Sequence, residues 1–236
     1  MADAQTLHDT SRATRTTRTS HAGPGDAGRK YVVEGIGTFF LTFTVVTGVL
    51  SGVVFTPLAA GAMLMVMAYA GAHISGGHYN PAVTAAVLWR RRIGIRDAVA
   101  YWIVQFVAGA VAALAARAVV VHPQSSTLTL SGHTLIAAAV VELIYTFALC
   151  YVVLNVATSR DQSGNGFYGL AIGFTVAAGA FAVGGISGGS FNPAVTLGGA
   201  IGGLFAWSTL WVYFVVEAAA GGLAGLAFLR LNPADS

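Results

Sequence analysis

Two short motifs in the sequence carry the residues most suited to a specific chemical role. Each reads Asn-Pro-Ala and follows a glycine-rich segment. Asparagine is a favoured residue just before a helix, and proline suits the first helical position, where a backbone N–H is not needed. If each asparagine carbonyl caps its own helix, its NH₂ group is left to donate hydrogen bonds into a cavity. The candidate residues are Asn80, Pro81, Ala82, Asn192, Pro193 and Ala194.

The two motifs belong to an internal repeat. Residues 72–84 (AHISGGHYNPAVT) recur at 184–196 (GGISGGSFNPAVT) with nine of thirteen positions identical, at an offset of 112 residues. The same offset aligns 101–114 with 213–226, and Glu34 pairs with Glu142 at an offset of 108. A duplication of this length predicts two structural halves that place both motifs at one point.

The elements that position these motifs are long apolar runs. Charged residues make up only 9% of the 236 residues and hydrophobic residues 56%, whereas a soluble domain is near 25% charged. About 20 apolar residues are needed to cross a bilayer as a helix. Six runs approach this length, at 31–53, 57–76, 98–120, 135–157, 167–185 and 204–229, and two shorter ones lie at 81–89 and 193–201.

Each half therefore holds three spans and one half-helix. Because three is odd, the second copy inserts upside down, and inverted repeats place their site at the bilayer midplane where broken helices meet. The predicted fold is an all-α membrane protein with six transmembrane helices and two re-entrant half-helices. Two half-helix N-termini facing each other would give a site that donates hydrogen bonds and repels cations.

Basic residues indicate the topology. Most lie in the N-terminal segment and at 90–96, and they flank apolar runs rather than forming a nucleic-acid-binding patch. Both termini are therefore expected in the cytoplasm. We expect a disordered cytoplasmic tail over 1–30, a channel domain over 31–231 with repeats at about 31–120 and 135–231, and a C-terminal tail over 232–236.

With these residues in place, the chain resembles the aquaporin/major intrinsic protein family over about residues 30–231. The resemblance implies a passive pore in every protomer of a homotetramer in the plasma membrane, surrounded by lipid. In relatives, glutamates matching Glu34 and Glu142 hold the loops from behind the pore, and a histidine matching His73 lies near the cytoplasmic mouth. The role of His78 is open between loop support and pore lining. The other expected loop residues are Gly76, Gly77 and Gly188.

The narrow outer filter departs from the family pattern. Family members normally have arginine directly after the second motif, where this chain has Val195. The remaining filter positions fall on Ala60, Ala180 and Gly189, which predicts a wide, apolar filter. Thr196, in contrast, stands where glycerol channels usually have aspartate, and this favours a water channel. The solute preference therefore stays open.

We expect a channel for water and small uncharged solutes: glycerol-like polyols, urea-like amides and neutral metalloid hydroxides. One alternative is a predominantly water-selective aquaporin. A proton-coupled transporter using Glu217 and His73 is a rival from another class, and a scaffold protein without flux is a third. No nucleophile–base pair or metal cluster is evident, so neither an enzyme, a cofactor, a metal site nor a nucleic-acid partner is expected.

Overall fold

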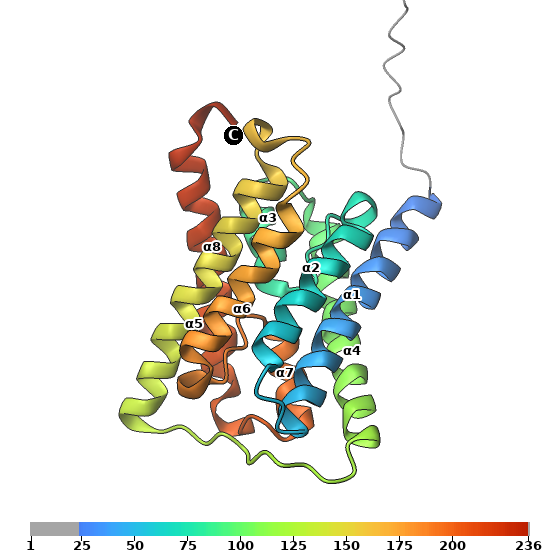
Figure 1. Ribbon diagram of the computed structural model, residues 1–236. Helices are drawn as coiled ribbons and strands as arrows, with labels where there is room; N and C mark the ends of the chain where they lie inside the picture. The colour runs from blue at the N-terminus through green and yellow to red at the C-terminus, as the bar shows by residue number, and fades with distance from the viewer. Residues whose placement is uncertain (1–23, 236) are drawn as a thin grey trace, which may run out of the picture.

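The computed structural model describes residues 24–235, and within them the fold is a helical bundle (Figure 1). Within this range the only β pairing is an isolated bridge between Leu128 and Phe205. Six helices are long and apolar enough to cross a membrane, which confirms the predicted fold class. The helices are α1 (Pro24–Leu50), α2 (Thr56–Ser75), α3 (Pro81–Trp89), α4 (Ile95–Val119), α5 (Gly132–Val153), α6 (Tyr168–Ser187), α7 (Pro193–Gly202) and α8 (Leu210–Leu231).

The first helix begins earlier than the sequence indicated. α1 starts at Pro24, inside the segment expected to be a tail, and proline is readily accommodated at a helix start. Its first turns are tied to α4, because Lys30 Nζ and Tyr31 Oη each lie 2.6 Å from the Asp97 carboxylate. The disordered tail predicted for the remaining residues, 1–23, lies outside the described part of the chain.

The end of the chain is also ordered, contrary to the expectation of a tail over 232–236. Residues Pro233–Asp235 form a short 3₁₀ helix, and Asp235 is buried. Its carboxylate forms ion pairs of 2.9–3.2 Å with three arginines from two loops. No local pattern indicates this contact, because its three arginines, Arg90, Arg92 and Arg160, lie far from Asp235 along the chain.

Each half-helix packs mainly on the opposite half of the molecule. α3 packs against α8, and α7 packs against α4. A Cβ added at Gly109 of α4 would lie 2.6 Å from the Ala194 carbonyl oxygen, and one at Gly221 of α8 would overlap the Ala82 carbonyl oxygen. Two repeat-related glycines therefore let each Asn-Pro-Ala motif lie directly against a helix of the other half.

The two halves also meet where α2 crosses α6. A Cβ at Gly61 would overlap the Gly173 carbonyl oxygen, and a Cβ at Gly173 would overlap that of Gly61. Both glycines are needed for this close approach of two backbones. They are separated by the repeat offset of 112 residues, so the pair marks the pseudo-twofold relation between the halves.

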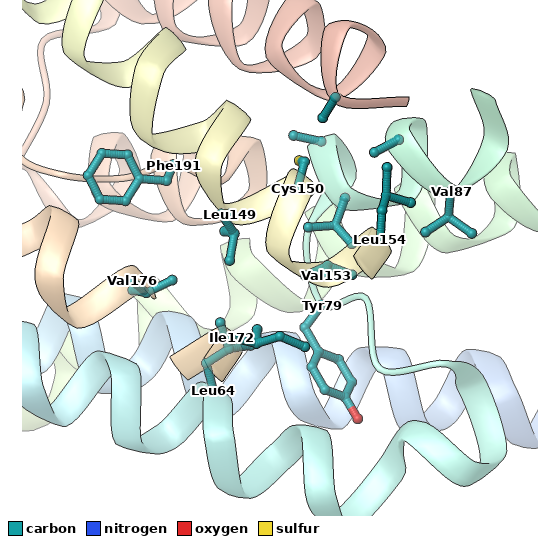
Figure 2. Close-up of a cluster of buried hydrophobic side chains, with 14 of the residues drawn as sticks. Leu64, Tyr79, Val87, Leu149, Cys150, Val153, Leu154, Ile172, Val176 and Phe191 are labelled. Atoms are coloured by element: carbon teal, nitrogen blue, oxygen red, sulfur yellow. The ribbon is translucent and has the colours of Figure 1, made fainter. Parts of the chain in front are cut away.

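The residues before the two asparagines anchor the re-entrant loops in the core (Figure 2). Tyr79 and Phe191 are both 1% exposed, and their rings point away from each other in the cluster. Both adopt positive φ, 49° and 52°, which non-glycine residues rarely do. Burial of two large rings stabilises this unfavourable backbone, and the same conformation recurs at repeat-related positions.

Candidate functional site

The two half-helices begin with the cap chemistry that their sequences indicate. The Asn80 side-chain carbonyl accepts a hydrogen bond from the Ala82 N–H at 2.8 Å, and that of Asn192 accepts one from the Ala194 N–H at 3.0 Å. Both asparagines have extended backbone, as N-cap residues do. Each amide NH₂ is therefore directed away from its own helix.

The NH₂ groups also bridge the two halves. Asn80 Nδ2 donates to the Phe191 carbonyl at 2.8 Å, and Asn192 Nδ2 donates to the Tyr79 carbonyl at 2.9 Å. An amide nitrogen has two hydrogens, so each asparagine keeps one N–H for a solute. The expectation that the whole NH₂ group is free is therefore wrong for one of its two hydrogens. The bridging bonds fix the separation of the two motifs.

Glu34 holds the first re-entrant loop. Its carboxylate is fully buried and accepts hydrogen bonds from the Ser75 hydroxyl at 2.8 Å and from the backbone N–H groups of His78 and Tyr79 at 2.9 and 2.7 Å. Bonds between a carboxylate and backbone N–H groups are among the stronger ones in proteins. The loop before Asn80 is thus fixed by one side chain of α1.

Glu142 does the same for the second loop. It is fully buried and accepts from the Ser187 hydroxyl at 2.6 Å and from the N–H groups of Ser190 and Phe191 at 3.0 and 2.8 Å. The three donors are the repeat mates of those around Glu34. Both glutamates therefore support the loops from behind and line neither of the two cavities described below.

Two tyrosines complete these supports, and sequence reasoning missed their role. Tyr101 Oη donates to the Ser75 carbonyl and Tyr213 Oη to the Ser187 carbonyl, both at 2.6 Å. These carbonyls end α2 and α6, where no helical N–H is available to them. The two tyrosines occupy the same position in the repeat. A hydroxyl group kept at this position in both halves could have indicated a shared structural role.

A cavity of about 420 Å³ leads to both asparagines. Its lining includes Gly77, Gly188, Asn80 and Asn192, and in the described part of the chain no Asp, Glu, Lys or Arg lines it. All four residues predicted for the filter line it: Ala60, Ala180, Gly189 and Val195. The four positions, chosen from the sequence alone, come from α2, α6, the second loop and α7, and in the structure they line the same cavity.

A second cavity of about 420 Å³ lies next to the first. Both cavities are lined by His78 and Val153, so these two side chains lie where the cavities meet. The second cavity is more polar, with Lys30, Arg92 and Asp97 in its wall. Gly76 lines it, whereas Gly77 lines the first cavity. Both asparagines line the first cavity, and the two cavities together outline the path on which the function is argued below.

The two histidines singled out from the sequence have different surroundings. His78 is buried, its Nδ1 lies 3.0 Å from the Thr84 hydroxyl, and its ring packs edge-on against Tyr101. It both supports the loop and lines the path. His73, in contrast, is exposed on α2 and lines neither cavity, so the prediction that it lines the pore is wrong. α2 stays helical to Ser75 and turns this side chain outward.

Comparisons with known proteins agree with this arrangement. The sequence profile of the family described as Major intrinsic protein matches residues 25–228. The chain is 43% identical over 197 residues to "Glycerol uptake facilitator protein-like 6" of Lactiplantibacillus plantarum, covering 79% of this chain and 90% of that protein. It is 35% identical over 218 residues to "Aquaporin TIP2-3" of Zea mays, covering 85% and 86%.

A solved structure shows the same fold. The aquaglyceroporin from Plasmodium falciparum superposes with a TM-score of 0.71 at 20% sequence identity, covering 86% of this chain and 95% of that one. At this identity the likeness concerns the fold alone.

Proposed function

The chain belongs to the major intrinsic protein family and is a multi-pass membrane channel, and from this premise we propose that its pore passes water and small uncharged solutes. The solutes are glycerol-like polyols, urea-like amides and neutral metalloid hydroxides. They share a small size, no net charge and groups that both donate and accept hydrogen bonds.

The observation that carries this proposal is the wall made by Ala60, Ala180, Gly189 and Val195. Gly189 lies against Ala180, so that a Cβ added at Gly189 would be 3.2 Å from the Ala180 Cα. None of the four side chains is larger than valine, and none carries a charge or a hydrogen-bond donor. Exclusion by size is therefore weak, and a solute larger than water keeps part of its hydration as it enters.

Selection against cations rests on the midplane. Two half-helix N-termini carry positive partial charge toward the same point, and each asparagine offers one N–H there. A neutral solute exchanges water for these donors and for loop carbonyls, whereas a cation finds donors where it needs acceptors. This barrier needs no fixed arginine.

The named relatives span both solute classes, because one is named for glycerol and the other as an aquaporin. A water-selective pore is the alternative, favoured by Thr196 in place of aspartate. A proton-coupled transporter is less well supported. His73 is exposed, and Glu217 lines neither cavity, so the path lacks the pair of titratable groups on which that reading depended.

Stopped-flow light scattering on proteoliposomes tests the proposal. Water, urea and glycerol gradients are applied to vesicles with and without protein at matched size. Faster relaxation for all three solutes supports the proposal. Accelerated water flow with urea and glycerol at the rate of empty vesicles replaces it with the water-selective alternative, and no acceleration at all supports a scaffold.

We further propose a homotetramer in the plasma membrane with cytoplasmic termini. The start of α1 and the C-terminus lie at the same end of the bundle, as Figure 1 shows. Arg90, Arg92 and Arg160 are joined to the C-terminal Asp235, and basic residues favour the cytoplasmic side. Native mass spectrometry in mild detergent should give four chains, and a uniform monomer would contradict the tetramer.

A further inference from the structure

The support of the second half-helix contains a buried carboxyl group with an unusual set of contacts. Glu217 of α8 is fully buried. Its Oε1 accepts hydrogen bonds from the Asn192 backbone N–H at 3.1 Å and from the Thr196 hydroxyl at 2.9 Å. Its Oε2 is buried and accepts no hydrogen bond from any described residue. Glu142 accepts from the backbone N–H groups of Ser190 and Phe191, and Glu217 accepts from the next one along the chain, so the two carboxyl groups lie side by side.

The first half shows what occupies this place in its repeat mate. Gln105 of α4 aligns with Glu217 in the repeat. Its amide nitrogen donates to Glu34 Oε2 at 2.9 Å and lies 3.1 Å from the Thr84 hydroxyl. Glu34 therefore accepts a fourth hydrogen bond, from a neutral side chain. An ionised Glu217 has no hydrogen with which to do the same for Glu142.

No positive charge is present to separate two carboxylates at this point. No Lys, Arg or His among the described residues forms an ion pair with Glu142 or Glu217. The other titratable groups that face the pair are the Tyr213 hydroxyl and the Cys150 thiol, and neither is a cation. Two ionised carboxylates in contact in a buried site repel each other strongly, and one proton shared between them removes this repulsion.

The hydrogen bonds also indicate which group holds the proton. Glu142 accepts three hydrogen bonds over both of its oxygens, an arrangement that favours the ionised form. Glu217 accepts hydrogen bonds at Oε1 alone. A proton on Glu217 Oε2 turns its one orphaned atom into a donor, and the neighbouring Glu142 carboxylate is an acceptor for it.

We propose that Glu142 and Glu217 form a built-in proton-binding site, in which Glu217 is a protonated carboxylic acid that donates to Glu142 and accepts from Asn192. Glu217 then does for the second loop what Gln105 does for the first. It is a positioning residue, because it acts on the path through the backbone of Asn192 and touches no solute.

The bound proton also sets the charge beside the pore. With it, the acid pair carries one negative charge, the same as Glu34 with neutral Gln105. Without it, a second negative charge would lie next to Asn192 and weaken the barrier to cations that the half-helix dipoles supply. The bound proton thus gives the two halves the same net charge beside their asparagines.

Infrared spectroscopy of the full-length protein in lipid tests this directly. The C=O stretch of a buried protonated carboxyl group is separate from the carboxylate and amide bands. We expect this band in the wild type at neutral pH, its loss in Glu217→Gln, and its retention at a shifted frequency in Glu217→Asp. The matched control is Gln105→Glu, which builds the same acid pair in the first half and should add a second band.

Water flux separates this inference from the proposed solute range. Glu217→Gln keeps a donor toward Glu142, so its water flux per channel should stay within about twofold of wild type. Absence of the protonated band from the wild type overturns the inference, whichever solutes pass. A band that persists unchanged in Glu217→Gln overturns it as well, because the proton would then reside elsewhere.

Discussion

The two loops that carry Asn80 and Asn192 are held by almost the same set of hydrogen bonds, and they differ where the last donor is supplied. In the first, a neutral amide at Gln105 donates to Glu34. In the second, a carboxyl group at Glu217 lies against Glu142. Backbone geometry was thus preserved between the halves while the chemistry of one supporting side chain changed. The repeat therefore places a side chain beside each supporting glutamate. The residue type can differ between the halves as long as that side chain has a hydrogen to donate.

The two half-helices also end differently. The last turn of α3 leads to Arg90, which is 1% exposed, lies over the Phe228 ring and donates to the Asp235 carbonyl at 2.6 Å. α7 instead ends at Gly202 and is followed by Gly203 in a left-handed conformation, with an exposed contact from Arg117 to the Ile201 carbonyl. The end of α3 is therefore fixed by buried charge, and the end of α7 by backbone geometry.

The largest effect is expected from removing either supporting glutamate. Glu34→Ala and Glu142→Ala each leave at least three buried donors without an acceptor, at about 1–3 kcal/mol per group. That sum is comparable with the whole stability of many domains. Both variants should lose most of the folded protein, measured as monodisperse yield from membranes. A normal yield for one variant alone would show that the halves are not equivalent supports.

Replacing the asparagines should have the next largest effect. Asn80→Ala and Asn192→Ala each remove a helix cap, a bridge to the other half and the N–H that faces the path. Each lost hydrogen bond costs about 1 kcal/mol, and about 1.4 kcal/mol of added barrier slows flux tenfold. Water flux per folded channel should fall severalfold in both variants at equal reconstitution. Unchanged flux in either would exclude that asparagine as a donor to the solute.

A smaller effect is expected where the motifs contact the opposite half. Gly109→Ala and Gly221→Ala force a methyl group against the carbonyls of Ala194 and Ala82. Overpacking of this kind costs about 1–3 kcal/mol. Both variants should unfold at lower temperature in a detergent thermal-shift assay. Gly94→Ala is the matched control, because a Cβ there meets no atom within 4 Å, and an equal shift in the control would refute the close contact.

The smallest effect is expected from removing the Asp235 carboxylate, which pairs with arginines next to the end of α3 and, among the described residues, has no counterpart at the end of α7. The Arg160 backbone N–H and the neighbouring Arg90 guanidinium hold the pKa of Asp235 below its usual value of 3.8. Because folding lowers the pKa of Asp235, its ionised carboxylate stabilises the folded state fully at pH values above 3.8. This stabilisation is lost as the pH falls below that value. Asp235→Asn should therefore lower the unfolding temperature slightly at neutral pH and remove this part of the acid sensitivity. Identical acid sensitivity in the variant would contradict the assignment.

Much of the fold was predictable because its signals are local. Apolar length gave the six spans, and the Asn-Pro pairs marked where α3 and α7 begin. The contacts of Glu34 and Glu142 with the loops were implied by resemblance to relatives. The filter positions followed from alignment outward from the motifs, and they share one cavity wall.

The remaining features depend on contacts between distant segments, which spacing does not encode. The bridge from each asparagine to the opposite loop needs the fold to be assembled, and so does the burial of Asp235 among arginines. His73 was misplaced because matching a motif gives its position along α2 but not the direction of its side chain. Glu217 entered the sequence analysis only as part of the proton-coupled alternative. Its contact with Glu142 was not predictable, because the two residues come from different helices, α8 and α5.

The measurement that tests the account most directly is the ratio of glycerol to water permeability in wild type and Val195→Arg, both reconstituted in the same lipid. A guanidinium at this position narrows the wall formed with Ala60, Ala180 and Gly189 and adds a fixed charge. We expect glycerol to pass the wild type, and the ratio to fall at least severalfold in the variant while water flow stays measurable. A wild type that passes water and excludes glycerol, with no change of ratio in Val195→Arg, would contradict the wide, uncharged filter.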